Sequence, residues 1–266
     1  MPYRALALDV DGTLICAGQK QIAPQTTAAL KALQTRGVMV ALTTGRSAFA
    51  SDGSTLGTDF MPDWRVCANG AQILDAAGNI LHEKRIKAGD VERITAFAEQ
   101  NELPLTFTFD DAYYIYNQYA AYVAYYTAHA GEVPYLRDGT DRCRHRQSLP
   151  FGAYIIMPRK FHGELARLCP GIKLMEAALG SYDISPSDAD KKHGVGWMLS
   201  RLGIGFNELV AVGDSENDAE LLCAAGLGVA MGNAPAHIKT LADHVTDSVQ
   251  ENGVLAVIER FFGGDC

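Results

Sequence analysis

Hydrophobic positions in the first part of the chain follow the pattern of alternating strands and helices. Short apolar runs predict buried strands at Tyr3–Val10, Val38–Leu42 and Arg65–Ala68. Between the first two strands, apolar positions recur with helical spacing and predict a helix over Thr26–Arg36, for which Gly37 provides a stop.

The last third of the chain repeats this pattern. It predicts, in order, a helix, a strand, a helix and a strand at Gly196–Leu202, Leu209–Val212, Asp218–Ala225 and Leu227–Ala230. Strands that alternate with helices imply parallel βαβ units. We therefore predict an α/β fold, with a Rossmann-like parallel sheet that has helices on both of its faces.

The middle of the chain has a different pattern. Polar and apolar residues alternate, as in half-buried strands, at Leu105–Phe109, Tyr113–Tyr116 and Ala153–Met157, and helices are predicted at Asp90–Gln100 and Gln118–Ala130. This pattern predicts an antiparallel α+β insertion with one solvated sheet face. We expect residues 1–83 and 187–266 to form one discontinuous core domain, and residues 84–186 to form an inserted cap domain joined to it by a two-stranded hinge.

Composition restricts the classes of partner. The 266 residues are 48% hydrophobic and carry a formal net charge of −8, which argues against a nucleic acid or an anionic membrane as the main partner. The six cysteines form no CxxC pair, no secretory signal is visible, and no apolar run approaches the ~20 residues of a membrane span. We therefore expect a soluble, cytoplasmic protein that is a monomer or a small homo-oligomer and acts on a small molecule.

Two carboxylates stand at the end of the first predicted strand. Asp9 and Asp11 are two residues apart, so on a strand they point the same way, roughly 6.5 Å from each other. Ligands of parallel α/β sheets bind at the carboxyl ends of the strands, where this pair lies, and Gly12 allows the backbone to approach a ligand closely. The alternative is a pair of turn or capping aspartates.

Polar residues follow the second strand as well. The hydroxyl of Thr44 and the backbone N–H of Gly45 can donate hydrogen bonds to a phosphate oxygen, and Arg46 comes next. Taken alone, this stretch is more typical of an ordinary turn.

A third strand end adds Asp214, followed by Asn217 and Asp218, although either of the latter could simply cap a helix. If Asp9, Asp11 and Asp214 converge at one sheet edge, their mutual repulsion calls for a cation, and hard oxygen ligands suit Mg²⁺.

A lysine could complete such a site by balancing a phosphate and an aspartate. Lys191 and Lys192 are adjacent, so only one of them can point inward, and the residues alone do not decide which. A solvated surface lysine is the ordinary alternative for each.

Two groups in the middle region have a structural and a functional interpretation. Tyr119, Tyr122 and Tyr126 share a helical face, and we favour packing over a substrate-binding wall. Arg142 and its alternating neighbours Arg144 and Arg146 would line one face of a strand, where they would either meet a second anionic group of a substrate or form a solvated edge.

Together these motifs resemble a known family. DVDGT (Asp9–Thr13), the threonine of TTGR (Thr43–Arg46), the later lysine and GDSEND (Gly213–Asp218) resemble, in this order, the four motifs of the haloacid dehalogenase-like hydrolases. ANGA, DKKHGV and the tail VAMGNAPAHIKTLADHVTDSVQENGV are similar, more narrowly, to Cof-type phosphatases with a type IIB cap. The chain departs from the family in Val10, where relatives more often have leucine, and in SAFASDGSTLGTDF after TTGR, where we expect no regular helix.

The resemblance implies a role for each matching residue. Asp9 would be the nucleophile, and Asp11 the general acid and then the base. The residues that would hold Mg²⁺ are Asp9, Asp11 through its carbonyl, Asp214 and Asp218, and those that would hold the phosphoryl group are Val10, Thr44, Gly45, Lys191 and Asn217. The family pattern DKxxG(I/V) favours Lys191 over Lys192, and Asn69 and Arg46 would lie on the substrate side.

The resemblance implies a Mg²⁺-dependent phosphatase that acts on small phosphomonoesters, such as sugar phosphates or phosphorylated cofactors, through an aspartyl phosphate. Related enzymes without an acid at the position of Asp11 tend to be ATPases or dehalogenases. Two alternatives are a phosphomutase on sugar phosphates, which shares the nucleophile, and a non-catalytic ligand-binding protein of the same fold. The second would be expected to have lost a motif residue, and every motif position is filled.

Overall fold

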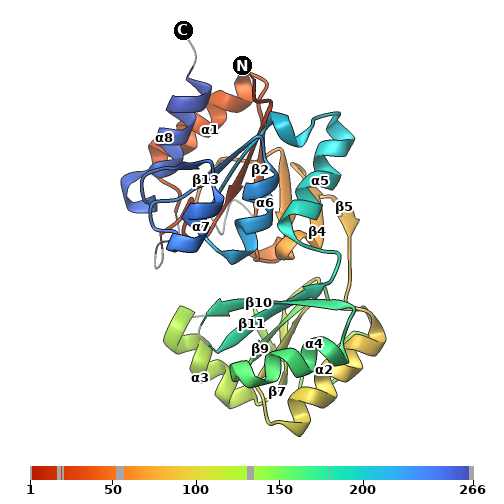
Figure 1. Cartoon of the computed structure of the whole chain (residues 1–266). Helices are drawn as coiled ribbons and strands as arrows, with labels where there is room; N and C mark the ends of the chain where they lie inside the picture. Colours follow the sequence, from red (N-terminus) through yellow and green to blue (C-terminus); the bar gives the residue numbers. More distant parts are fainter. Residues whose placement is uncertain are drawn as a thin grey trace. The chain divides into compact units, whose positions relative to one another are not determined.

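The computed structural model describes residues 2–16, 19, 21–51, 57–130, 135–178 and 180–263. The chain divides into two compact units (Figure 1), one of Met1–His82 with Asp190–Cys266 and one of Glu83–Ala189. The boundaries that we infer from the sequence, 83/84 and 186/187, lie one and three residues from these. The described residues contain no helix that is both long and apolar enough to cross a membrane.

An eight-stranded sheet forms the centre of the first unit, in the order β14-β13-β12-β1-β2-β3-β4-β5. Its strands are β1 (Ala5–Asp9), β2 (Met39–Thr43), β3 (Trp64–Cys67), β4 (Gln72–Asp75), β5 (Ile80–Glu83), β12 (Leu209–Gly213), β13 (Leu227–Ala230) and β14 (His244–Val245). From β14 to β3 every neighbouring pair is parallel, and β4 then pairs antiparallel with β3. The predicted Rossmann-like parallel sheet is therefore confirmed.

Helices pack on both faces of this sheet (Figure 1), and the side chains of β1 alternate accordingly. Leu6 and Leu8 lie in one apolar cluster with side chains of α1 (Pro24–Thr35) and α8 (Gly253–Phe262). The smaller Ala5 and Ala7 lie in the opposite cluster, with side chains of α5 (Lys191–Leu202), α6 (Ala219–Ala224) and α7 (Ala236–Leu241). Small side chains on this second face leave room for α5 and α6 close to the sheet.

Two glycines allow the first turn of α5 to approach the sheet. A Cβ on Gly194 would lie 2.5 Å from Cγ1 of Val66 in β3, and a Cβ on Gly70 would lie 2.1 Å from the carbonyl oxygen of Asp190. The helix begins at Lys191, five residues before the predicted start at Gly196, and Asp190 caps it by accepting the N–H of His193 at 2.8 Å. Glycine is a weak helix former, and Gly194 and Gly196 both lie in the first turns of α5. The start of the helix could therefore not be recognised in the sequence.

The second unit is built on a six-stranded sheet in the order β10-β11-β9-β6-β7-β8. Its strands are β6 (Leu105–Thr108), β7 (Tyr113–Asn117), β8 (Leu136–Asp138), β9 (Gly152–Ile156), β10 (Ile172–Ala178) and β11 (Ser181–Pro186). All pairs are antiparallel except β7–β8. Side chains of α2 (Ala88–Gln100) and α4 (His162–Leu168) share an apolar cluster with alternate residues of the sheet, which confirms the predicted α+β insertion.

The other face of this sheet is not simply solvated, contrary to the prediction. Tyr122 of α3 (Tyr119–Ala130) is buried, stacks on Tyr126 with 5.6 Å between ring centroids, and meets the ring of Tyr154 in β9 edge-on at 6.2 Å. Aromatic rings contribute much buried area, so a tyrosine-rich helix covers part of this face. The packing interpretation holds for Tyr122 and Tyr126, whereas Tyr119 is exposed.

The alternating arginines do not share a strand face. Residues Arg144–Arg146 form a 3₁₀ turn. The prediction failed because three alternating residues are too few to distinguish a strand from a turn. Arg142 pairs with Glu99 at 2.6 Å, and Arg144 pairs with Asp111 at 3.0 Å. The prediction of an arginine-lined strand is therefore wrong.

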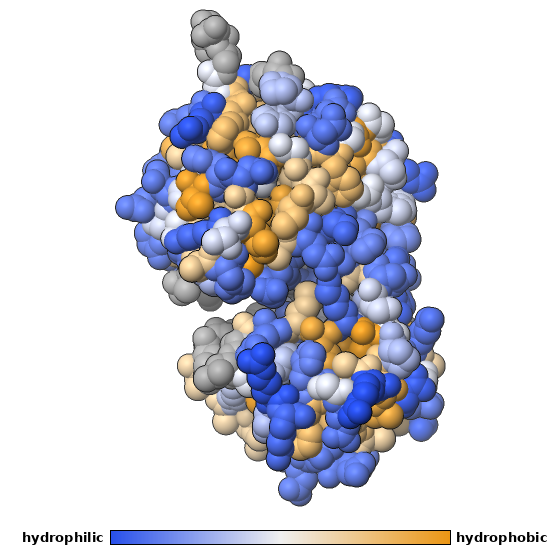
Figure 2. All heavy atoms as spheres, viewed as in Figure 1, coloured by the Kyte–Doolittle hydropathy of each residue, from blue (hydrophilic) through white to orange (hydrophobic). Residues whose placement is uncertain are grey.

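In the stretch after TTGR, Ala48–Ala50 form one 3₁₀ turn and residues 52–56 lie outside the described residues. The surface seen in Figure 2 carries hydrophobic patches that hydrophilic residues separate. The exposed large hydrophobic side chains belong to Met61, Ile80, Leu81, Tyr119, Leu168, Leu241 and Val245.

We expect Gly194→Ala to destabilise the protein by about 1–3 kcal/mol, because its Cβ would overlap Val66 in a packed core. The control is Gly163→Ala in α4, where a Cβ would meet nothing within 4 Å and where we expect a gain of up to about 1 kcal/mol. Urea unfolding of both variants checks this, and equal effects would contradict the close approach of α5.

Candidate active site

The register of the central strands brings three loops to one edge of the sheet. Asp9 at the end of β1 is aligned with Thr43 at the end of β2, and Leu8 is aligned with Val212 in β12. The residues that follow β2 and β12, Thr44 and Asp214, therefore leave the sheet beside Asp9. Parallel strands place their carboxyl ends together, as the sequence analysis assumes.

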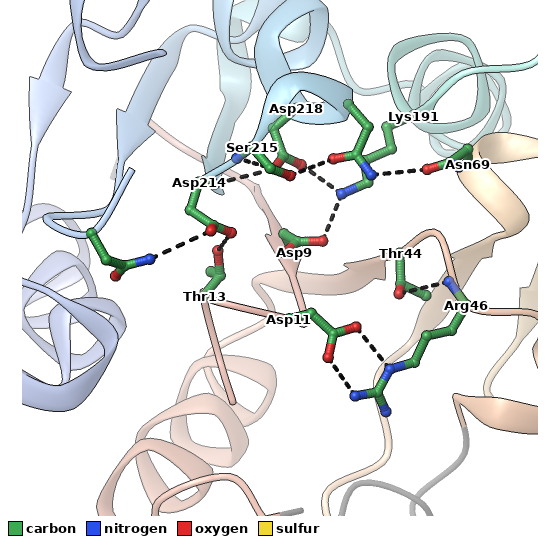
Figure 3. Close-up of polar contacts among 12 residues, drawn as sticks. Asp9, Asp11, Thr13, Thr44, Arg46, Asn69, Lys191, Asp214, Ser215 and Asp218 are labelled. Atoms are coloured by element: carbon green, nitrogen blue, oxygen red, sulfur yellow. Dashed lines mark hydrogen bonds and ion pairs between the residues drawn. The ribbon is translucent and has the colours of Figure 1, made fainter. Parts of the chain in front are cut away.

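A buried cation lies between two carboxylates at this edge (Figure 3). The Nζ of Lys191 donates to Oδ1 of Asp9 at 2.6 Å and to Oδ1 of Asp218 at 2.7 Å, and the Lys191 side chain is fully buried. Burial alone would lower the pKa of Lys191, but the carboxylates of Asp218 and Asp9 raise it above its usual value. The ammonium group therefore stays charged. Burial also raises the pKa of Asp9, and Lys191 opposes that effect.

The neighbouring lysine points elsewhere. Nζ of Lys192 lies 3.5 Å from Glu220, and the Lys192 side chain keeps 36% of its surface exposed. The structure thus brings Lys191, and not Lys192, to the acidic cluster.

Asp218 organises the loop that carries Asp214. Its Oδ2 accepts the backbone N–H groups of Asp214 and Ser215, each at 3.1 Å, while its Oδ1 accepts from Lys191. Both oxygens of Asp218 are therefore engaged within the protein. This arrangement suits a residue that supports a metal site more than one that binds the ion directly.

Asp214 is half-buried and presents its carboxylate to the same cluster. Thr13 donates its hydroxyl to Oδ1 of Asp214 at 3.1 Å. Burial, with the charge of Asp218 as a second cause, raises the pKa of Asp214 to about 6. Burial disfavours the charged form of a carboxyl group, and a neighbouring carboxylate adds to that effect.

These residues fit a divalent cation. One carboxylate oxygen from each of Asp9, Asp214 and Asp218 lies within 4.8 Å of the others. Three carboxylates face the single ammonium of Lys191, so up to two negative charges remain to be balanced. Carboxylate oxygens are hard ligands that suit Mg²⁺, and the cluster can hold a metal ion.

Asp11 does not share the environment of Asp9, although the sequence suggests that both point the same way. β1 ends at Asp9, and the next residues turn, with the N–H groups of Leu14 and Ile15 both bonded to the carbonyl of Val10. The exposed carboxylate of Asp11 is instead held by Arg46, at 2.8 Å from Nε and 2.5 Å from Nη2. A strand period does not extend through a turn, so the shared direction of the two side chains stays a prediction, while their partners and their exposure differ.

The Arg46 side chain is thereby occupied within the protein (Figure 3). Its guanidinium group forms two hydrogen bonds with Asp11 and a longer one with the carbonyl of Ala50. The structure places Arg46 beside the predicted general acid, and its role toward a substrate stays a prediction.

Two amides connect the second motif to the last one. Asn217 donates its Nδ2 to Oδ1 of Asn69 at 3.0 Å and accepts the hydroxyl of Ser215 at 2.9 Å. A Cβ on Gly45 would lie 3.3 Å from Oδ1 of Asn69, so the Asn69 amide lies directly over Gly45. Asn69 has a left-handed φ of 51°, which asparagine tolerates better than most residues.

Thr44 is buried and can still donate a hydrogen bond. Its Oγ1 accepts the backbone N–H of Arg46 at 3.1 Å, which leaves the hydroxyl proton for another acceptor. The side chain of Val10 lies in the apolar core, so any contribution of Val10 to phosphate binding rests on its backbone N–H.

Two residues that form hydrogen bonds in this site have no role assigned to them from the sequence, Thr13 and Asn233. Thr13 stands inside the DVDGT motif without an assigned role, and Asn233 stands in the tail after β13 and contacts both Gly12 and Asp214. Thr13 could be found from its place in the motif. Asn233 is 19 residues away from Asp214, and only the fold brings them together.

Comparison with known proteins identifies the class. A model of the haloacid dehalogenase-like hydrolase family matches residues 6–258. Phosphatase YwpJ of Bacillus subtilis is 30% identical over 288 residues, which cover 97% of this chain and 99% of YwpJ. The solved structure of the phosphatase BT1666 from Bacteroides thetaiotaomicron has a TM-score of 0.87 at 24% identity and covers 98% of this chain and 95% of its own. That of the subclass IIB sugar phosphatase BT4131 has a TM-score of 0.80 at 22% identity, with coverage of 97% and 99%.

The chain belongs to the haloacid dehalogenase-like hydrolases, and within them to the Cof-type, subclass IIB phosphatases. It is a phosphatase, that is, a phosphoric monoester hydrolase. The predicted family, fold class and class of enzyme are confirmed. The roles of the individual residues stay predictions.

We expect Lys191→Met to lower the free energy of unfolding by about 3–5 kcal/mol in EDTA, because it leaves two buried carboxylates without their cation. Lys192→Met is the matched control and should change the free energy of unfolding by less than about 0.5 kcal/mol. Urea unfolding of the two variants gives the comparison. Similar values would mean that the buried ion pairs do not stabilise the fold.

Proposed function

We propose that this chain hydrolyses small phosphomonoesters in two steps through an aspartyl phosphate on Asp9. The observation that carries the proposal is the position of the Asp9 carboxylate, buried at the end of β1 and bound to the ammonium of Lys191. A carboxylate is a weak nucleophile, and holding it at one orientation beside positive charge allows it to approach a phosphate dianion.

In the first step an oxygen of Asp9 forms a bond to phosphorus while the bond from phosphorus to the ester oxygen breaks. Asp11 gives its proton to the leaving alkoxide, which departs as an alcohol. In the second step Asp11 takes a proton from water, the resulting hydroxide attacks phosphorus, and the bond to Asp9 breaks to release inorganic phosphate. Nucleophile and acid are thus separate groups, in agreement with their different environments.

The phosphoryl oxygens need hydrogen-bond donors and positive charge. Four donors lie at the same sheet edge: the Thr44 hydroxyl, the backbone N–H of Gly45, the ammonium of Lys191 at the start of α5, and the amide of Asn217. Where water is excluded, donors that are already held in place before the reaction strongly stabilise the charge that develops in the transition state.

Asp9, Asp214 and the carbonyl of Asp11 would hold Mg²⁺, with Asp218 fixing the loop of Asp214. When bound, the ion neutralises charge on the transferring phosphoryl group and so reduces the repulsion between that group and Asp9. The three carboxylate groups that gather around the one ammonium of Lys191 support this assignment.

We propose sugar phosphates, or phosphorylated cofactors, as the substrates. The likeness to the sugar phosphatase BT4131 supports the fold only, so a panel of phosphorylated metabolites, scored by released inorganic phosphate, is the direct test. Release without a bisphosphate activator distinguishes hydrolysis from mutase activity.

We expect Asp9→Asn to lower kcat for an aryl phosphate by more than about 10³-fold, because an amide cannot form the acyl phosphate. Asp75→Asn, at the last residue of β4, is the control and should leave kcat unchanged. Turnover is measured in Mg²⁺ for both variants. A rate for Asp9→Asn close to that of the wild type would refute the nucleophile assignment.

We expect Asp11→Asn to reduce kcat by about 10²–10⁴-fold on an alkyl phosphate, which needs a proton on its leaving group. The leaving group of a p-nitrophenyl ester is far more acidic and departs without a proton. The rate of its first step should therefore fall much less. Rapid-quench detection of phosphorylated protein should therefore show the intermediate accumulating with the aryl ester. An equal fall in the rate of the first step with both esters would contradict the role of Asp11 as the general acid.

A further inference from the structure

Asn233 lies in the loop after β13, and its side-chain amide joins three segments of the first unit. Its Oδ1 accepts the backbone N–H of Val249 at 3.0 Å. Its Nδ2 donates to the carbonyl of Gly12 at 2.9 Å and lies 3.4 Å from Oδ2 of Asp214. One planar group therefore connects the C-terminal segment with the turn after Asp11 and with a predicted metal ligand.

The loop that carries Asn233 is itself held in place. The N–H of Met231 bonds to the carbonyl of Gly213 and the N–H of Gly232 to that of Asp247, each at 3.0 Å. A Cβ on Gly232 would come within 2.7 Å of the backbone nitrogen of Ser248. The backbone on both sides thus sets the position from which the Asn233 amide reaches the site.

The two oxygens of the Asp214 carboxylate are held from different directions. Thr13 donates to Oδ1, and the Asn233 amide lies against Oδ2. Gly12 packs under the same carboxylate, since a Cβ there would lie 2.3 Å from Oδ2. The carboxylate has little freedom to rotate while these groups are present.

Only an amide satisfies all the partners of residue 233 at once. The Val249 N–H needs an acceptor, whereas the Gly12 carbonyl needs a donor. An aspartate would offer acceptors alone and add a charge beside Asp214, and an apolar side chain would offer neither. The choice of asparagine is thus matched to the site.

We propose that Asn233 is a positioning residue of the metal site, which orients the Asp214 carboxylate and the Gly12 carbonyl before a divalent cation binds. The inference rests on the proposed function, in which Asp214 is a ligand of Mg²⁺. Groups that orient metal ligands through hydrogen bonds affect the affinity for the ion without touching it. Asn233 acts through Asp214 and takes no part in the reaction itself.

The test is the dissociation constant for Mg²⁺, measured by isothermal titration of the EDTA-treated, dialysed full chain. We expect Asn233→Leu, and the shorter Asn233→Ala, to raise this constant about 10–100-fold. Asn79→Leu is the matched control, because the Asn79 amide also donates to an aspartate, Oδ2 of Asp75 at 2.9 Å, away from the site. Its constant should equal that of the wild type.

Two further readouts separate positioning from a structural role. The Mg²⁺ concentration for half-maximal phosphatase activity should rise by the same factor as the dissociation constant, while kcat at saturating Mg²⁺ stays within about twofold of the wild type. The unfolding midpoint in EDTA should match that of Asn79→Leu, because the exposed Asn233 side chain leaves water free to replace its bonds.

An unchanged dissociation constant in both Asn233 variants, or an equal rise in Asn79→Leu, overturns the inference. A loss of stability in EDTA without a weaker affinity for Mg²⁺ in the folded protein also overturns it, because Asn233 would then be structural only. Failure of the proposed metal site looks different: the wild type itself would bind no Mg²⁺, or Asp214→Asn would bind it unchanged.

Discussion

The first unit depends on one electrostatic arrangement, the Lys191 ammonium enclosed between the carboxylates of Asp9 and Asp218. A fully buried cation is tolerated only when hydrogen-bonded counter-charges surround it. Meeting that condition requires α5 to start close to the sheet, which the absence of side chains on Gly70 and Gly194 permits. It also requires the parallel register that sets the ends of β1 and β12 side by side.

The same arrangement leaves the site short of positive charge. Asp214 joins the cluster with a raised pKa, and burial raises that of Asp9 as well. A protein selected for stability alone would avoid three carboxylates at one buried edge. In the proposed site this imbalance favours a divalent cation, which in turn would attract a phosphate group. Natural proteins often give up stability for activity at such sites.

The proposed chemistry belongs to one of the two units. Every residue proposed to react or to bind phosphate belongs to the first unit, which the family match covers on both sides of the insertion. The second unit has an independent apolar core and a helix whose tyrosines pack against its own sheet. The residues that stabilise the second unit are therefore separate from the groups that are proposed to react.

The sequence by itself determined most strands of the parallel sheet and the groups at its edge, because hydrophobic period and strand-end motifs are local properties. Asp9, Thr44 and Asp214 were found in this way, and so was the inserted unit. The residues alone left open which of Lys191 and Lys192 points inward, although the family pattern favours Lys191, and the fold places Lys191 there. The fold alone decided that Asp11 faces Arg46 and that Asn233 reaches Asp214. These facts depend on where a turn leaves a strand and on contacts between residues far apart in the chain, and such contacts leave no period in the sequence from which they could be read.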